Sequence, residues 1–412
     1  MKINYQDLIN FLSEKPSKED LSQKLFQLGH EHEISGDIFD MELTPNRGDC
    51  LSLIGLARDL AVFFGKSNSI DLFDGDIEPL EINFENLSPK DCPKISFLEI
   101  EIEDSKVEYK SYLENFFNTI GGNKANLFTD ISNYLSYELG QPTHCFDRES
   151  IKSKLIFEHR ECNSTFKTLL GSEVTLKNNN CVFLLNGEII SLAGVMGGAS
   201  TACSFNTKKV LVECAYFNPE SIIGKSIKYN LVSDAAHKFE RGVDIASQEM
   251  VLRRFAKIVQ DHAKIKSIKL NEAEEKFDAL FYWWFRVDSI DLSKDYSTIG
   301  AIEYINAEVS QNDTVQVVFN KEERYYYITG ISKASFPYKT NYINFPFENH
   351  KLTIIIENKF NNIENLKYIH DVANQYINKV TDTSISILNG DQFMIDSLNT
   401  DNSIFTYKSN FG

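Results

Sequence analysis

The clearest hydrophobic period in the chain spans residues 127 to 139. Apolar residues recur there every four positions and predict a helix with one buried face; they are Leu127, Ile131, Leu135 and Leu139. Gly140 and Pro142 predict the end of this helix, which leaves His144 on the following turn. Ser132 and Asn133 lie on the same helix, so one segment could present a hydroxyl, an amide and an imidazole to a pocket. The pattern also fits a capped helix in which His144 has no functional role and forms hydrogen bonds with nearby backbone groups.

Other helices and strands are predicted on both sides of this segment. Apolar positions recur at helical spacing within residues 51–64 and 248–265. Asn186-Gly187 joins two apolar runs and is a strong signal for a hairpin. Strands are predicted at residues 95–102, 155–159, 166–170, 174–176, 181–185, 188–191 and 210–214. Short strands interspersed with helices predict an α+β fold with a mixed or antiparallel central sheet.

Changes in pattern divide the chain into four predicted parts. Residues 1–66 are expected to form a small helical module in which Ser17 caps a helix. Residues 67–92 are acidic and aperiodic, as expected of a linker, and residues 93–270 hold the central helix and most predicted strands. Residues 271–412 predict a C-terminal α+β region whose relationship the pattern leaves open. Its expected elements are a hairpin at 315–328, a helix near 363–377, and strands near 352–356, 384–388 and 404–407.

Composition narrows the class of protein. A chain of 412 residues with 42% hydrophobic content is long enough for two or three domains, and we expect it to be soluble and cytoplasmic. No apolar run approaches the length of a membrane span, and the N-terminus lacks the order of a signal peptide. The seven cysteines include no Cys-x-x-Cys pair, which predicts reduced, mostly buried thiols and neither a zinc site nor a disulfide framework.

The charge distribution bears on nucleic-acid binding. A net charge of −17 argues against a nucleic-acid partner, because phosphate contacts need local positive potential. Between Lys208 and Lys269, however, the sequence contains twelve Lys and Arg but only seven Asp and Glu, which is a local excess of positive charge. Arg253 and Arg254 within this stretch are the candidate phosphate-binding residues. A helix with a solvated basic face would give the same excess.

Four stretches in this order and at these spacings carry a resemblance. The first runs from Asp130 to Asp147 around His144, and the others are Leu192–Gly198, Val212–Phe217 and Ser233–Asp244. Together they resemble the β subunit of bacterial phenylalanyl-tRNA synthetase, specifically the editing domain that removes tyrosine wrongly attached to the phenylalanine tRNA. The resemblance covers about residues 113–258, and Glu42–Asp59 resembles the stretch leading into that domain.

The resemblance implies a role for each candidate site residue. The glutamate that corresponds to Glu213 reads the tyrosine hydroxyl in that family, and here it lies in an apolar strand where a carboxylate needs a partner. Alternation also allows it a place on the solvent face. By resemblance, His144, Ser132 and Ser233 would position the ester and the attacking water. The residues expected to shape the pocket are Asn133, Ala193, Gly194 and Ala235. No Ser-His-Asp or Cys-His arrangement is evident, so we expect the water to be activated by positioning and by His144.

As a whole, the resemblance implies a reduced β subunit of phenylalanine-tRNA ligase. Such a subunit binds tRNA(Phe) and edits Tyr-tRNA(Phe) in this family, while a separate α subunit binds ATP and magnesium and performs aminoacylation. The recognised domain itself is expected to hold no cofactor and no metal. The oligonucleotide-binding barrel and the catalytic-like modules of the family find no match in the sequence. Two alternatives stay open: a free-standing hydrolase that edits in trans, and a non-catalytic module that binds tRNA or a subunit.

Overall fold

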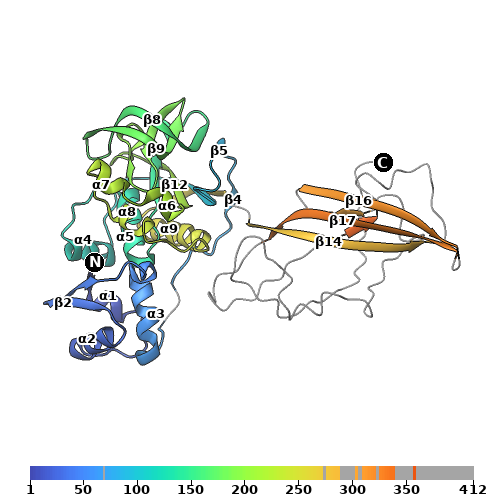
Figure 1. Cartoon of the computed structure of the whole chain (residues 1–412). Coiled ribbons are helices and arrows are strands. Elements are labelled where there is room, and N and C mark those ends of the chain that lie inside the picture. The colour runs from blue at the N-terminus through green and yellow to red at the C-terminus, as the bar shows by residue number, and fades with distance from the viewer. Residues whose placement is uncertain are drawn as a thin grey trace. The chain divides into compact units, whose positions relative to one another are not determined.

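The computed structural model describes residues 1–67, 70–271, 275–287, 302–304, 309–321, 324–338 and 356–358. The chain divides into two compact units, residues 1–273 and residues 274–412. The helices and strands of each unit are shown in Figure 1. Across the described segments, no helix combines the length and apolar character required to cross a bilayer.

The N-terminal part of the first unit contains a small sheet as well as helices. Its elements are β1 (Lys2–Asn4), α1 (Tyr5–Ile9), α2 (Lys18–Gln27), β2 (Glu31–Ser35) and β3 (Ile38–Glu42). Strand β3 pairs antiparallel with both β1 and β2. The predicted cap of α2 is confirmed, because the Ser17 side chain accepts a hydrogen bond from the Asp20 amide.

The prediction of a purely helical N-terminal module was therefore wrong. Strands β2 and β3 are five residues each and are joined at Gly36, whose φ of 63° suits a tight turn. Only His32 in β2, and Phe39 and Met41 in β3, are buried. Because β2 and β3 are short and mostly polar, their few apolar residues do not form an alternating pattern that predicts a strand.

Helix α3 (Leu53–Phe64) links this part to the helices that cover the central sheet. Ser52 caps it by accepting a hydrogen bond from the Gly55 amide, and a short 3-10 turn, Gly48–Cys50, precedes it. Its buried leucines join the same core as α1 and α2 and as the central helix α5 (Leu127–Leu139). Helix α5 has the bounds that its hydrophobic period predicts, and Gly140 ends it at a φ of 80°.

Two five-stranded sheets form the rest of the unit. The first has the order β4-β13-β6-β12-β7, and all of its pairs are antiparallel except β4 with β13. Its strands are β4 (Glu78–Pro79), β6 (Lys94–Ile102), β7 (His144–Asp147), β12 (Lys209–Tyr216) and β13 (Ile265–Asn271). The second sheet has the order β11-β10-β9-β8-β5. Its strands are β5 (Phe84–Asn86), β8 (Leu155–Lys167), β9 (Glu173–Leu185), β10 (Glu188–Leu192) and β11 (Met196–Gly197).

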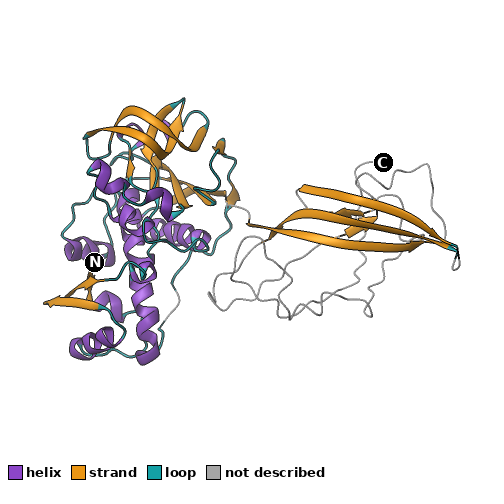
Figure 2. Cartoon of the chain, in the orientation of Figure 1, coloured by secondary structure: helices purple, strands orange, loops and turns teal. Residues whose placement is uncertain are grey.

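The predicted hairpin is the connection between β9 and β10. Leu185 pairs with Glu188, and Asn186 and Gly187 both have positive φ, as a two-residue hairpin turn of this kind requires. Helices complete the unit: α4 (Ser111–Ile120), α6 (Pro219–Ile222), α7 (Lys225–Tyr229), α8 (Asp234–Phe239) and α9 (Gln248–His262). Figure 2 shows the strands and helices of this unit together. The predicted α+β fold class is confirmed.

Strand β12 is buried on both of its faces. Val210, Val212 and Cys214 belong to the core that includes α4, α5 and α9. Leu211 and Ala215 belong to a second core, which includes the side chains of β8, β9 and β10. Because side chains alternate along a strand, Glu213 lies on the same face as Leu211 and Ala215. It therefore points into the layer between the two sheets.

The second unit is described only as strands. Strand β17 (Tyr325–Tyr338) pairs antiparallel with β14 (Glu275–Val287) and with β16 (Val309–Asn320). Strand β15 (Ile302–Tyr304) pairs with β18 (Ile356–Asn358). The predicted hairpin at 315–328 is confirmed as part of the β16 and β17 pair. The helix expected near 363–377 and the strands expected near 384–388 and 404–407 lie outside the described residues.

Candidate functional site

Glu213 and His144 lie directly opposite each other in the first sheet. Glu213 is on the inner strand β12 and His144 begins the edge strand β7, and their Cα atoms pair in the antiparallel register. Side chains at opposed positions point to the same face, with Cβ atoms about 4.5–5.5 Å apart. The site is thus a carboxyl and an imidazole side by side between two sheets. No hydrophobic period could have indicated this pairing, because 68 residues separate the two positions.

The side chain of Glu213 is buried in an apolar layer. The residue is only 5% exposed, and among the described residues no side chain or amide donates a hydrogen bond to its carboxyl oxygens. Burial in this apolar layer disfavours the charged form and raises the pKa of Glu213 to about 8. At neutral pH the side chain is consequently a neutral acid that can both donate and accept a hydrogen bond.

The imidazole of His144 is also buried, and burial changes its pKa. Its Nε2 atom is buried and has no hydrogen-bond partner within the part of the chain that the structure describes. Burial lowers the pKa of His144 to about 4, so the ring is neutral at physiological pH. The ring packs edge-on against Phe146, with ring centroids 4.4 Å apart and planes at 84°. A neutral ring held in one orientation can accept a proton from, or position, a nearby water.

The hydroxyls of Ser132 and Ser233 hold the segments that form the site. Ser132 Oγ donates to Thr143 O at 2.7 Å and lies 2.8 Å from Thr143 Oγ1, which fixes the turn into His144. Ser233 caps α8 by accepting from the Ala236 amide at 3.0 Å, and it donates to Val195 O at 2.8 Å. Both hydroxyls thus act as positioning groups in this structure.

The four residues expected to shape the pocket have different environments. Asn133 is exposed on α5, Ala193 is buried in the second core and Ala235 packs against that core from α8. Gly194 has a φ of 70°, and a Cβ on it would come within 3.0 Å of Ile222 and 3.1 Å of Phe217. Its backbone conformation and the apolar packing around it account for a glycine at this position.

Gly197 is the glycine that approaches the histidine, and the sequence did not single it out. A Cβ at this position would lie 2.3 Å from His144 Cε1 and 3.0 Å from His144 Nε2. It would also lie 2.8 Å from Leu169 Cδ1. Gly197 is in the second sheet and His144 in the first, so this contact closes one side of the layer. The Met196-Gly197-Gly198 run was the available signal, since adjacent glycines often mark close backbone approach.

The two candidate phosphate-binding arginines make contacts inside the protein. Arg254 forms two hydrogen bonds with the buried Glu138, at 2.8 and 2.7 Å. Arg253 bonds Glu249 at 2.8 Å and the Phe73 carbonyl at 3.2 Å. These residues lie on α9 and contribute to the fold, apart from the Glu213 and His144 pair.

The segment that contains this pair is similar to a known domain family. Residues 95–264 match the B3/4 domain family. This segment is therefore similar to a B3/4 domain. It contains both sheets' central strands, the opposed Glu213 and His144, and helices α4 to α9.

Curated relatives extend the similarity beyond the B3/4 domain. The chain is 31% identical over 257 residues to the phenylalanine–tRNA ligase beta subunit of Sodalis glossinidius, which covers 61% of this chain and 31% of the relative. It is 33% identical to that of Burkholderia pseudomallei, over 55% of this chain and 28% of the relative. The matched part therefore spans about three-tenths of the length of these relatives. The expected resemblance to this family is confirmed.

A solved structure is also similar. It is an N-terminal fragment of the phenylalanyl-tRNA synthetase beta subunit from Pyrococcus horikoshii, at 12% identity, with 82% of this chain and 93% of that chain covered and a TM-score of 0.34.

Proposed function

We propose that this chain is a β-type subunit of phenylalanine-tRNA ligase whose B3/4 domain hydrolyses tyrosine from mischarged tRNA(Phe). The observation that supports this most is the buried, unpartnered carboxyl of Glu213 directly opposite the neutral ring of His144. Ester hydrolysis with selection for one hydroxyl needs such a pair: a buried polar group for the hydroxyl and a neutral base near the ester.

Selection for tyrosine follows from the burial of Glu213. A phenol hydroxyl entering the layer between the sheets would give the carboxyl a hydrogen-bond partner, whereas phenylalanine would leave it unpaired. A buried polar group without a partner costs about 1–3 kcal/mol, which is about ten- to a hundred-fold in a rate ratio. The apolar walls around Leu211 and Ala215 suit an aromatic ring.

In this proposal the other expected residues support the pair. Ser132 holds the turn that carries His144, Ser233 holds α8 beside Val195, and Ala193, Gly194 and Ala235 shape the apolar wall. Asn133, which is exposed on α5, would lie toward the tRNA. ATP and magnesium would bind to a separate α subunit in the same cytoplasmic enzyme, and the B3/4 domain itself would require no cofactor.

The test is a deacylation assay with tyrosine and phenylalanine attached to the same tRNA(Phe), with and without the α subunit. Glu213→Ala should slow tyrosine release by about ten- to a hundred-fold and erode the preference over phenylalanine. His144→Ala should lower the rate for both esters with little change in their ratio. Glu220→Ala, which removes an exposed glutamate, is the matched control.

The outcomes of this assay distinguish the three functional hypotheses. Activity that needs the α subunit would support a β-type subunit, and full activity of the chain alone would favour a free-standing editing enzyme. Wild-type protein that releases no tyrosine in either condition would contradict the hydrolytic proposal and leave only a binding role.

A further inference from the structure

A second group of side chains in the first unit carries metal-binding chemistry. His159 on β8 and Cys181 on β9 are directly opposed in the antiparallel register, so their side chains share one face. Asp91, in the loop after β5, places its Oδ1 atom 2.8 Å from His159 Nδ1. The carboxylate, imidazole and sulfur atoms of the three residues all lie within 4.8 Å of one another.

We propose that Asp91, His159 and Cys181 bind a divalent transition-metal ion of the zinc class. A thiolate, an imidazole and a carboxylate are the three ligand types that zinc takes from proteins. Zinc with bonds of about 2.0–2.3 Å holds its ligand atoms roughly 3.3–3.8 Å apart, so the three atoms need to move by about 1 Å. One thiolate and one carboxylate also neutralise a doubly charged ion.

The surroundings of the three residues favour such a site. Ser221 Oγ donates to Asp91 Oδ1 at 2.6 Å, and the Asn218 amide donates to the Asp91 carbonyl at 2.8 Å. Hydrogen bonds of this kind orient a metal-binding carboxylate. The side chains of Asp91 and His159 are 22% and 29% exposed, so a metal ion can enter and a water can occupy the fourth position. Cys181 is buried and forms the inner end of the site.

Binding of the ion releases one proton. Burial raises the pKa of Cys181 to about 12, so the thiol is protonated without a metal. The metal forms its bond to sulfur as the S–H bond breaks, and the proton leaves to solvent. A ring bound through Nδ1 carries its remaining proton on Nε2. The Asp91 oxygen exchanges its hydrogen bond with His159 Nδ1 for a bond to the metal.

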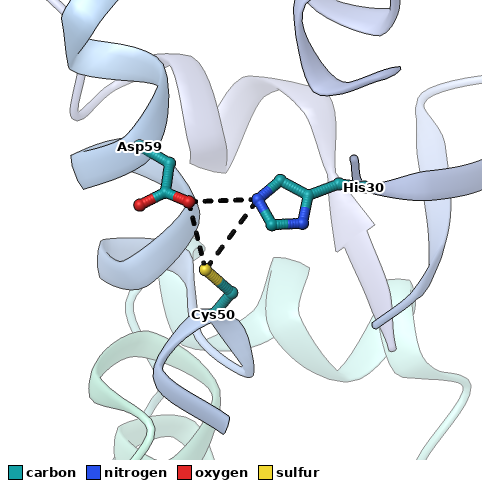
Figure 3. Close-up of side chains that lie close together, drawn as sticks. All are labelled: His30, Cys50 and Asp59. Atoms are coloured by element: carbon teal, nitrogen blue, oxygen red, sulfur yellow. Dashed lines mark hydrogen bonds and ion pairs between the residues drawn. The ribbon is translucent and has the colours of Figure 1, made fainter. Parts of the chain in front are cut away.

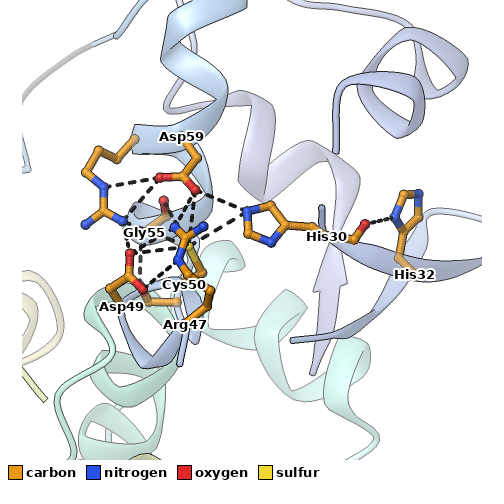
Figure 4. Close-up of polar contacts among 9 residues, drawn as sticks. His30, His32, Arg47, Asp49, Cys50, Gly55 and Asp59 are labelled. Carbon is orange, nitrogen blue, oxygen red and sulfur yellow. Dashed lines mark hydrogen bonds and ion pairs between the residues drawn. The ribbon is translucent and has the colours of Figure 1, made fainter. Parts of the chain in front are cut away.

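The N-terminal part of the chain offers a comparison with the same donor types. His30, Cys50 and Asp59 also lie close together, as Figure 3 shows, with Asp59 Oδ2 3.1 Å from His30 Nε2 and 3.5 Å from Cys50 Sγ. Arg47, seen beside Cys50 and Asp59 in Figure 4, places its Nη2 atom 2.7 Å from Cys50 Sγ and 2.5 Å from Asp59 Oδ2. Arg58 contacts Asp59 as well. A guanidinium group therefore occupies the position that a metal ion would need.

The Asp91 group differs in this respect. Within the part of the chain that the structure describes, Asp91 forms no ion pair with a lysine or an arginine. Lys225 bonds the Asn179 carbonyl at 2.5 Å, and its charge favours ionisation of the Cys181 thiol. This site cannot be predicted from the sequence, since its ligands come from three separate segments and no Cys-x-x-Cys spacing is involved.

The experiment titrates the full chain, treated with a chelator, with Co²⁺ and then with Zn²⁺. Cobalt bound to a thiolate should give a near-ultraviolet charge-transfer band, and one equivalent of zinc should abolish it. Cys181→Ser should remove the band, and Asp91→Asn should weaken cobalt binding by more than the about 10- to 100-fold lost with an outer hydrogen-bond partner. Cys50→Ser, in the group of the same donor types, is the matched control and should keep the band.

Circular dichroism without metal establishes that each variant is folded. A wild-type chain that gives no thiolate band would overturn the proposal. So would a band that persists in folded Cys181→Ser or disappears in folded Cys50→Ser. If Cys181→Ser does not fold, the decision rests on Asp91→Asn, in which unchanged cobalt affinity would also overturn it.

Discussion

Two glutamates of the first unit are buried to nearly the same extent but have opposite surroundings. Glu138, on α5, is 2% exposed and Glu213, on β12, is 5% exposed. Glu138 accepts two hydrogen bonds from Arg254 and one from Tyr134, at 3.0 Å. Glu213 receives none from the described residues, and it lies opposite His144, whose buried Nε2 atom has no partner among those residues. The first glutamate is part of the fold, and the second is available to a ligand.

A buried polar group with a structural role differs from one with a functional role in whether the protein itself supplies its partner. A buried charge is tolerated when its partner is built into the protein, as Arg254 is for Glu138. A buried acid without a partner keeps its proton and weakens the fold, so an advantage elsewhere must explain it. In this chain the explanation we propose is recognition of a hydroxyl.

The largest expected effect comes from breaking the structural pair. Arg254→Met should destabilise the first unit by about 3–5 kcal/mol, because it leaves Glu138 buried without its cation. Arg253→Met is the matched control, and its partly exposed partner Glu249 predicts a loss of about 0–1 kcal/mol. Hydrogen exchange of α5 and α9 is the suitable measurement, since both tryptophans lie in β14 of the second unit and their fluorescence would report on that unit. Equal losses in the two variants would contradict the distinction.

The next prediction concerns how the free energy of unfolding depends on pH because of Glu213. Its pKa is about 8 in the folded chain and 4.5 ordinarily, so between these values the folded chain keeps a proton that the unfolded chain has released. The free energy of unfolding should therefore fall as pH rises, by up to about 1.4 kcal/mol per pH unit. His144, with its pKa lowered from 6.5 to about 4, has the opposite effect, which is strongest between these two values and fades above pH 6.5.

From pH 6.5 to 8 the Glu213 contribution is the larger of the two. Wild-type protein should lose up to about 2 kcal/mol across this range, at up to about 1.4 kcal/mol per unit. Glu213→Gln cannot ionise and should lose much less. Urea unfolding followed by far-ultraviolet circular dichroism at several pH values measures the difference. Parallel pH profiles for the two proteins would mean that Glu213 has a partner that keeps it charged.

The sequence predicted the parts of this site that depend on local pattern. The period from Leu127 to Leu139 predicted α5, and Asn186-Gly187 predicted its hairpin, because both signals lie within a few residues. The face of Glu213 was left open, since β12 is buried on both sides and hydrophobic alternation disappears in such a strand. The partner of Arg254 could not be predicted either, because Glu138 lies 116 residues away.

The smallest effect tests whether the hydroxyl of Ser233 positions the site. Ser233→Ala removes the cap of α8 and the donor to Val195 O, which should destabilise the unit by about 1 kcal/mol. Ser233→Thr keeps the hydroxyl and should retain stability within a few tenths of a kcal/mol, since threonine caps nearly as well. Tyrosine release should follow the same order, because α8 moves only when its cap is lost. If the threonine variant loses activity while it keeps its stability, the added methyl group intrudes on the substrate, and Ser233 then lies against the ligand itself.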